Sequence, residues 1–390
     1  MDHTKILKQA QSILPWLIET RRSFHMQPET AMAEYKTRDR ICLLLNEMGI
    51  GHKAVAKTGV IGHIRAKHPG KTIALRADID ALPMDDKKTT SYCSAIDGKM
   101  HACGHDVHTT ILLGAAKLLS QMKHNLPHNI ILVFQPAEET CEGAKALIRE
   151  GALDSPKPDA IFALHSAPRF KSGQIGIKAG TYAAASDAID VRIKGRSSHG
   201  ARPYQGIDAI VIAAHFITAA QTIISRNISA HDRAVLSFGQ IQGGDKRNII
   251  ANEVFIQGTL RTLSPDIRKN VLRRIEEMVA QLPDSFGGKG SIAVRPGACL
   301  LQNDTAMIDH IRKNGELLLG KDNVVREKYP SMGVEDFAFY LESIPGAIFS
   351  LGTRGEDETT SHPVHTNLFD VDETAMVYGV ALQTMNVLAL

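Results

Sequence analysis

The sequence predicts an α/β protein, a largely parallel sheet with helices on both faces, interrupted by a small α+β domain of ferredoxin-like type. Short apolar runs bounded by turn residues alternate with helical periodicity in the first and last parts of the chain, which is typical of buried parallel strands. The order of elements changes between about residues 182 and 297. With 390 residues, the chain exceeds the usual size of one core. We therefore expect a larger domain in two pieces, 1–181 and 298–390, and an inserted domain over 182–297.

Elements of the larger domain follow in order. Apolar residues recur at helical spacing over 4–26 and 35–48, predicting two opening helices. Short apolar runs predict buried strands at 71–77, 129–134, 159–164 and 346–351. Helical patterns between the first three strands predict helices over 107–122 and 143–151. This alternation gives strands that are covered on both faces.

The inserted domain has a different rhythm. The predicted order is strand 187–194, helix 206–226, strand 234–241, strand 252–261, helix 265–282 and strand 291–295. That order is the split βαβ arrangement. Ser264 followed by Pro265 predicts the start of the second helix, because a hydroxyl favours the N-cap and proline the first helical position.

Composition excludes several classes of protein. Hydrophobic residues make up 43% and charged residues 22%, so the chain resembles ordinary globular proteins and not disordered ones. The net charge of +3 is too small to predict nucleic-acid or membrane-surface binding. No signal peptide or membrane span is expected, because Glu19, Arg21 and Arg22 interrupt the first apolar stretch. Five cysteines without an export signal predict reduced thiols in a cytoplasmic protein.

Side chains that can bind metals follow the ends of the predicted strands. In open α/β sheets, ligands bind beyond the carboxyl ends of the strands. The residues at these ends are Asp78 and Asp80, Glu138 and Glu139, His165, and His362 with His365. One such residue alone would be interpreted as a cap or turn residue, but ligand-type residues at four strand ends indicate a site.

A fifth segment, Met100-His-Ala-Cys-Gly-His-Asp-Val-His108, leads into the predicted helix at 107. Thiolate, imidazole and carboxylate together favour zinc and its neighbours. We interpret Cys103 and His105 as ligands, and expect Cys103 to be a thiolate because it precedes a helix N-terminus. Asp106 is interpreted as a helix cap, and the histidines at 101 and 108 as polar loop residues.

Glu138 and Glu139 are adjacent, so in an extended loop their side chains point in different directions. One would face the metal and the other a water molecule bound to it. Hydrolysis of an amide needs both an acidified water and a base that takes its proton. The alternative is that both are solvated loop charges.

Four segments occur in this order: Arg76-Ala-Asp-Ile-Asp-Ala-Leu-Pro83, His101-Ala-Cys-Gly-His-Asp-Val-His108, Gln135-Pro-Ala-Glu-Glu139 and Ala163-Leu-His165. Together they resemble the M20 metallopeptidase family, and more narrowly its aminoacylase-like amidohydrolase branch, which includes hippurate and auxin-conjugate hydrolases. The resemblance extends from residues 21–25 to 365–370. It implies a metal-dependent enzyme that cleaves the amide of small N-acyl amino acids with a metal-bound hydroxide as the nucleophile.

The resemblance also implies two divalent ions per chain, which could be zinc, manganese, cobalt or nickel. Cys103 would bridge or ligate them, and the rest of the shell would be His105, Glu139, His165 and His365. Glu138 would be the general base, and Asp80 the aspartate that orients a ligand or the base. Asp78 stands where other branches carry a metal-binding histidine, so its role stays open, as do the roles of His101 and His362.

The inserted domain resembles the family's lid and dimerisation domain, which implies a homodimer or a higher homo-oligomer. His199 matches a histidine that helps to stabilise the oxyanion, often in the partner's site. Asn248 and Arg261 match lid positions that contact substrate, and arginine suits bidentate carboxylate recognition. The segment 197–201 is less glycine-rich than usual, and Asn367 stands where a serine-proline pair is frequent. These departures leave the substrate open.

Two alternatives remain at this point. A dipeptidase or carboxypeptidase of the same family would also cleave an amide beside a free carboxylate. A non-catalytic metal-binding protein, or a structural zinc site on Cys103 and histidines, would keep ligands without a base. Glu138 beside Glu139 argues against this second class.

Overall fold

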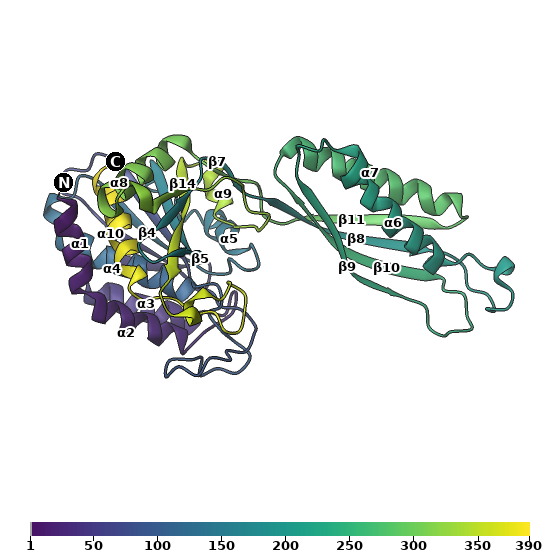
Figure 1. The fold of residues 1–390 in the computed structure, drawn as a ribbon, viewed down its shortest axis with the longest axis horizontal. Helices are drawn as coiled ribbons and strands as arrows, with labels where there is room; N and C mark the ends of the chain where they lie inside the picture. The colour runs from purple at the N-terminus through teal and green to yellow at the C-terminus, as the bar shows by residue number, and fades with distance from the viewer. Residues whose placement is uncertain (1) are drawn as a thin grey trace. The chain divides into compact units, whose positions relative to one another are not determined.

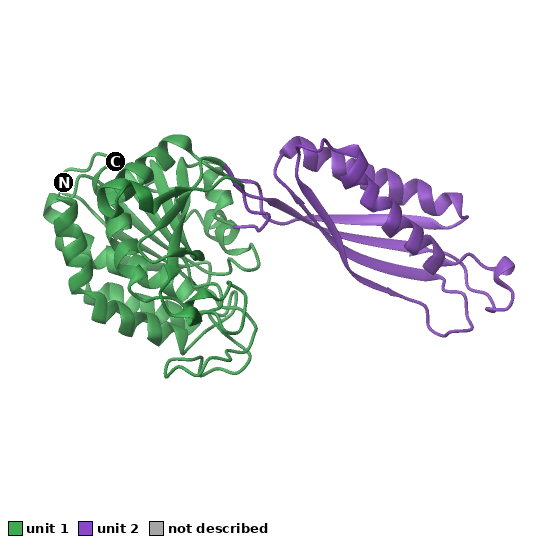
Figure 2. Cartoon of the chain, viewed as in Figure 1, with its two compact units in different colours: residues 1–180, 302–329, 336–390 green, residues 181–301, 330–335 purple. Residues whose placement is uncertain are grey.

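A computed structural model of the chain describes residues 2–390 and divides them into two compact units (Figure 2). Unit 1 comprises residues 2–180, 302–329 and 336–390, and unit 2 comprises 181–301 and 330–335. Each unit has its own hydrophobic core. The sequence thus builds unit 1 from segments that lie on both sides of an insertion.

Unit 1 contains an eight-stranded sheet in the order β1-β2-β4-β3-β5-β14-β6-β13. The strands are β1 Gly51–Val55, β2 Gly59–Ile64, β3 Thr72–Asp78, β4 Asn129–Gln135, β5 Ala160–Lys171, β6 Ile175–Ile177, β13 Val324–Arg326 and β14 Gly346–Arg354. The central strands β4, β3, β5 and β14 run parallel, whereas β1–β2, β2–β4 and β6–β14 are antiparallel. The prediction of a largely parallel sheet is confirmed. A separate pair joins β7 (Gly180–Ala183) to β12 (Leu301–Asn303).

Helices flank this sheet. They are α1 His3–Ser12, α2 Leu14–His25, α3 Tyr35–Glu47, α4 His105–Gln121, α5 Gly143–Arg149, α8 Thr305–Leu319, α9 Ala338–Leu341 and α10 Ala375–Leu388. All seven residues of β3 are buried, so both faces of the sheet are covered. The single helix predicted over 4–26 was wrong: α1 ends before Ile13, and Pro15 lies in the first turn of α2. Proline has no N–H to continue a helix interior but is tolerated in a first turn.

Unit 2 is an antiparallel four-stranded sheet, ordered β11-β8-β10-β9, with two helices against it (Figure 1). Its elements are β8 Ala185–Lys194, α6 Ala209–Asn227, β9 Ala234–Gly243, β10 Glu253–Thr262, α7 Pro265–Ser285 and β11 Lys289–Pro296. This order confirms the predicted split βαβ arrangement. The Ser264 side chain accepts the Ile267 N–H, and Pro265 opens α7, as predicted.

Among the helices described within residues 2–390, α6 is the one that is long and apolar enough to cross a membrane. Its buried residues include Ile212, Phe216 and Ile223, which belong to the core of unit 2. A core helix meets the same criterion of length and composition, so the criterion gives weak support for a membrane span.

Candidate active site

The five predicted metal ligands come together in unit 1. Cys103, His105 and His165 offer donor atoms that lie within 4.8 Å of one another, and Cys103, Glu139 and His365 form a second such group. Cys103 belongs to both groups. Its Sγ lies 3.4 Å from His165 Nε2 and 3.2 Å from His365 Nε2. The two groups therefore share one sulfur.

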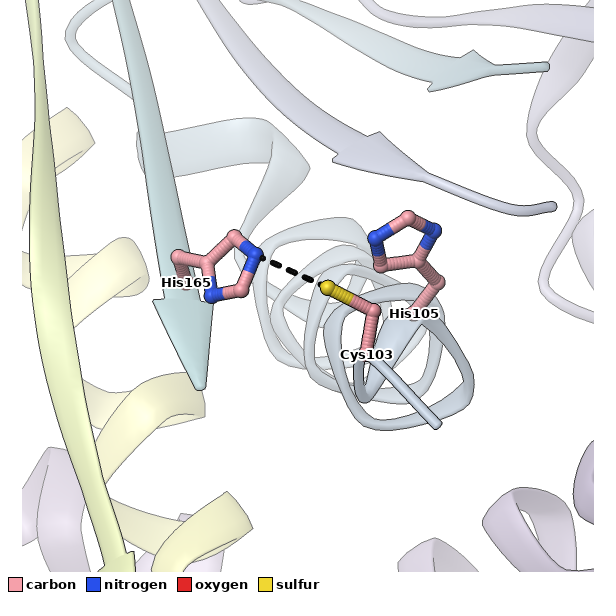
Figure 3. Close-up of side chains that lie close together, drawn as sticks. All are labelled: Cys103, His105 and His165. Atoms are coloured by element: carbon pink, nitrogen blue, oxygen red, sulfur yellow. Dashed lines mark hydrogen bonds between the residues drawn. The ribbon is translucent and has the colours of Figure 1, made fainter. Parts of the chain in front are cut away.

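Three loops and a strand bring these donors to one place. Cys103 and His105 lie at the start of α4, and His165 projects toward them from β5 (Figure 3). Glu139 follows β4, and His365 lies in the segment between β14 and α10. The expected end of a strand at residue 164 was too early, because parallel pairing with β14 continues through His165, opposite Ser350.

The backbone takes unusual conformations beside the donors. Gly104, between two predicted ligands, has φ +85°, and a Cβ there would lie 2.7 Å from Ser166 Oγ. Glycine is needed for both reasons. Ala137 and His365 also have positive φ, at +52° and +62°. Such conformations in residues other than glycine concentrate at functional sites.

Hydrogen bonds orient the two imidazoles. His105 Nδ1 donates to the Asp80 carbonyl at 2.9 Å, and His165 Nδ1 donates to the Ser166 carbonyl at 2.9 Å. Each Nε2 therefore carries a lone pair instead of a proton. His105 Nε2 and Glu139 Oε1 are buried without a hydrogen-bond partner and lie 3.9 Å apart, and Glu139 Oε1 lies 3.4 Å from His365 Nε2. Buried polar atoms are rarely left unpaired, and a divalent cation about 2 Å from each would satisfy both. The residues thus fit a metal centre.

Asp80 organises the loop that carries the two glutamates. Its Oδ1 accepts the backbone N–H of Glu138 at 3.0 Å, and its Oδ2 accepts that of Glu139 at 3.1 Å. The backbone carbonyl of Asp80 also accepts a hydrogen bond from His105 Nδ1. Glu138 is 6% exposed, and its Oε2 lies 4.0 Å from His105 Nε2. One buried aspartate therefore fixes both glutamates against the donor cluster.

Charges in the site respond to burial and to neighbours. Burial raises the pKa of the Cys103 thiol well above its usual range, although His105 opposes the shift. The expected thiolate is therefore not favoured by the protein alone, since loss of solvent outweighs the effect of His105. Burial also opposes ionisation of Glu139, but its contacts with His365 and His105 lower its pKa overall. A cation would favour both anions.

Three interpretations from the sequence require correction. Asp106 does not cap α4, whose N-cap is Gly104 without a side-chain bond; its Oδ2 instead accepts from Arg21 Nε at 2.7 Å. His101 does lie in the loop before α4, but it is buried, and His108 lies within α4; each is 1% exposed. Burial lowers the pKa of His101 to about 3 and that of His108 to about 4. The spacing of His105 and His108, three residues apart on one helix face, was the available signal that both face the site.

The lid residues lie in unit 2. The His199 loop runs beside residues 248–249: His199 pairs with Ile249, and the Asn248 carbonyl accepts the Gly200 N–H at 2.8 Å. His199 is exposed. Arg261 lies on β10 opposite Ser186, with Nη1 buried and without a hydrogen-bond partner. The structure thus brings His199 and Asn248 together but places Arg261 toward the other end of the sheet.

The chain is similar to known proteins along almost all of its length. The model for "Peptidase family M20/M25/M40" matches residues 74–386. N-acetyl-L-cysteine deacetylase of Bacillus subtilis (strain 168) is 41% identical over 362 residues, which cover 93% of this chain and 85% of that protein. Thermostable carboxypeptidase 2 of Saccharolobus solfataricus is 34% identical over 380 residues, covering 96% and 95%.

A solved structure agrees with these matches. The YXEP protein of Bacillus subtilis, a dinuclear metal binding peptidase from the M20 family, superposes with a TM-score of 0.84 at 32% identity, covering 97% of this chain and 98% of that one. Sequence, fold and the clustered donors lead to one assignment. The protein is a metal-dependent amidohydrolase and belongs to peptidase family M20/M25/M40.

Proposed function

We propose that this cytoplasmic enzyme cleaves the amide bond of N-acyl amino acids, releasing a carboxylic acid and a free amino acid. The observation that carries the proposal is the pair of donor groups that share Cys103, with the carboxylate of Glu138 beside them. The identity of 41% with a deacetylase of an N-acetyl amino acid supports this substrate class.

Two divalent ions, drawn from zinc, manganese, cobalt and nickel, would be held by the two groups. The proposed ligands are Cys103, His105, Glu139, His165 and His365. When bound, such ions acidify a water molecule and polarise the carbonyl of the amide. The donor types support this choice of metals, because thiolate and imidazole favour zinc and its neighbours.

Glu138 would act as the general base. Its carboxylate takes a proton from the attacking water and returns it to the leaving nitrogen. Asp80 would hold the base and the ligand Glu139 in fixed positions, since it accepts both backbone N–H groups. A base held in this way keeps its distance to the donor cluster in both steps of the reaction.

We assign His199 to the oxyanion and Asn248 and Arg261 to the substrate. His199 follows Lys194 and Asn248 precedes Glu253, and these two residues pair at one end of the β8–β10 ladder. Arg261 pairs with Ser186, eight residues along the same ladder. Eight residues of strand span about 26 Å. A small substrate cannot touch both ends of one lid, so the full set requires lids from two chains.

A homodimer through unit 2 follows from this assignment. The outer strand β9 pairs only with β10 in the described sheet. Val235 and Ile241 on β9 are 40% and 53% exposed, and Ile210 and Val211 on α6 are 48% and 44% exposed. An uncovered strand edge with apolar side chains favours pairing with a second copy. Light scattering would test this, and a monomer at assay concentrations would contradict it.

The second candidate is a carboxypeptidase or dipeptidase, which the 34% identity to a carboxypeptidase favours. The family match argues against the non-catalytic alternative. A panel of N-acetyl and N-benzoyl amino acids, matched with dipeptides of the same C-terminal residue, decides between the two. We expect kcat/KM at least tenfold higher for the acylated series with each metal tested. Higher values for the dipeptides would support the second candidate.

A further inference from the structure

A chain of buried side chains lies behind the proposed ligand His165. Asp78 Oδ2 accepts from Arg76 Nη1 at 2.7 Å, and Asp78 Oδ1 lies 2.6 Å from His108 Nδ1. His108 Nε2 lies 2.7 Å from the backbone nitrogen of Ser166. The side chains of Arg76 and Asp78 are 0% exposed, and that of His108 is 1% exposed. The chain therefore has no contact with bulk solvent.

These contacts fix the protonation of the His108 ring. A backbone N–H can only donate, so His108 Nε2 must accept from Ser166 and carries no proton. The ring proton is then on Nδ1, where it is donated to Asp78. The carboxylate sets the tautomer, as it does for many histidines that serve a reacting group or metal.

Ser166 connects His108 to the proposed metal ligand His165. Its N–H is held by His108, and its carbonyl accepts His165 Nδ1 at 2.9 Å. That bond turns His165 Nε2 toward Cys103 Sγ, 3.4 Å away. Ser166 also packs against Gly104, where no Cβ would fit. The peptide of Ser166 thus supports both His165 and the loop that carries Cys103 and His105.

Asp78 itself is poorly placed to bind a cation. Its Oδ2 lies 3.7 Å from His105 Nε2, and it forms a donor group with His105 and His108. Both of its oxygens, however, are occupied by Arg76 and His108. Arg76 is in turn anchored to Gln135 and Asp336, at 2.9 Å each. Binding a cation would require this arrangement to break.

We propose that Asp78 and His108 are positioning residues that act as one unit and hold His165, through the peptide of Ser166, in the orientation that binds metal. The proposal rests on the proposed metal centre. It predicts that either residue can be lost with the same effect, because each is useful only when the other orients it. Supporting partners of metal ligands typically change metal affinity by about 10–100-fold.

The test measures zinc affinity of the purified full-length chain by competition with a chromophoric chelator, and metal content after dialysis. The variants are Asp78→Asn, His108→Ala and the double variant. His310→Ala is the matched control, because it removes a partly buried histidine on α8 whose Nε2 contacts the Asn386 carbonyl instead of the metal ligands. Circular dichroism and thermal unfolding of the metal-free proteins show whether each variant is folded.

We expect each single variant to lose about 10–100-fold in affinity for the more weakly held zinc ion, and the double variant to lose no more than either single one. His310→Ala should stay within about threefold of wild type. Additive losses, a loss with Asp78→Asn but none with His108→Ala, or unchanged affinity in both would overturn the proposal. The first result would show independent roles, and the second would make Asp78 a ligand.

Cys103→Ala separates this outcome from failure of the metal centre itself. If Cys103→Ala still binds two zinc ions with wild-type affinity, the proposed centre is wrong. If Cys103→Ala loses zinc while His108→Ala keeps it, the centre stands and only the positioning role fails.

Discussion

Glu138 is the residue on which turnover depends in the proposed mechanism. Glu138→Gln keeps the size of the side chain and removes its basicity, so kcat should fall by about 10²–10⁴-fold while metal content stays at the wild-type value. Glu142→Gln is a suitable control, because Glu142 is an exposed carboxylate in the same loop. Hydrolysis assays and metal analysis on one preparation of each variant are sufficient. Wild-type turnover in Glu138→Gln would remove this residue from the mechanism.

We expect Asp86 to contribute to the loss of stability of the fold in acid. Burial opposes its ionisation, but His25, Lys88 and the Ser94 N–H lower its pKa below the usual 3.8. A depressed pKa means that the carboxylate stabilises the fold above pH 4, and that this stability is lost as the pH falls below that value. Asp86→Asn should cost about 2 kcal/mol at pH 7, and the difference from wild type should shrink as urea unfolding is repeated at lower pH.

Asp85→Asn provides the comparison for this measurement. Asp85 is exposed and accepts one N–H, from Gly98. Its replacement should cost about 0.5 kcal/mol or less. A difference between Asp86→Asn and wild type that is independent of pH would contradict the assignment.

At the same scale, residue chemistry in the sequence predicts some side chains better than others. Cys103 precedes a helix and His165 follows an apolar run in the sequence, a pattern that metals favour, and their side chains do converge. Asp106 could not be interpreted correctly, because its partner Arg21 lies 85 residues away. His108 likewise depends on Asp78, 30 residues earlier. Partners brought together only by tertiary structure leave no local signal.

At the scale of elements, Arg21 ties α2 to the segments that carry the site. Its Nε donates to Asp106 in α4 at 2.7 Å, and its Nη2 donates to Asp370, before α10, at 3.1 Å. The side chain is 0% exposed, and burial opposes its charge, but the surrounding carboxylates raise its pKa. The bond to Asp106 reaches the residue next to His105. The position of α2 and the order of the metal loop are therefore coupled.

Arg21→Met should destabilise the protein by about 3–5 kcal/mol, because it leaves buried carboxylates without their cation. Arg22→Met is the matched control, since the neighbouring Arg22 is 38% exposed and pairs with Glu373; it should cost about 1 kcal/mol or less. Denaturant unfolding of the full-length chain, followed by two spectroscopic probes, measures the free energy of unfolding of both variants. Equal losses in the two variants would contradict the coupling of α2 to the site.

Elements with clear periodicity or apolar runs could be predicted from sequence. The strands β3, β4 and β14 begin within one residue of their predicted starts. In contrast, α10 is buried along almost its whole length, so it has no polar face and no amphipathic pattern to detect. The hairpin β1–β2 was also not predicted; all but one residue of β2 is buried, so the alternation that marks a half-exposed strand is missing.

At the scale of the whole molecule, the sequence indicated an inserted domain because the order of elements changes, not because a linker separates the parts. Residues 330–335 nevertheless group with unit 2. A segment of six residues is too short to show a periodicity, so its place in unit 2 is visible only in the folded chain. The relation between two chains is further removed from sequence patterns, since an exposed strand edge such as β9 looks like any other strand.

Mixing two inactive variants tests whether lids act across chains. Glu138→Gln lacks the base but has an intact His199, and His199→Ala has the base but lacks the histidine. In a two-fold dimer with exchange, a mixed pair contains one complete site if His199 acts on the partner chain, and none if it acts within its own. Random exchange makes half of the dimers mixed, so activity should return to about one quarter of wild type.

The measurement is hydrolysis of the best N-acyl amino acid after the variants are mixed, denatured gently and refolded together, with each variant treated alone as the control. If the subunits of each variant are cross-linked before mixing, so that they cannot exchange, activity should not return. Absence of recovery in a mixture proven to contain mixed dimers would place His199 in the site of its own chain. In that case Arg261, about 26 Å along the same sheet, would have to come from the partner's lid, because one lid cannot present both residues to one small molecule.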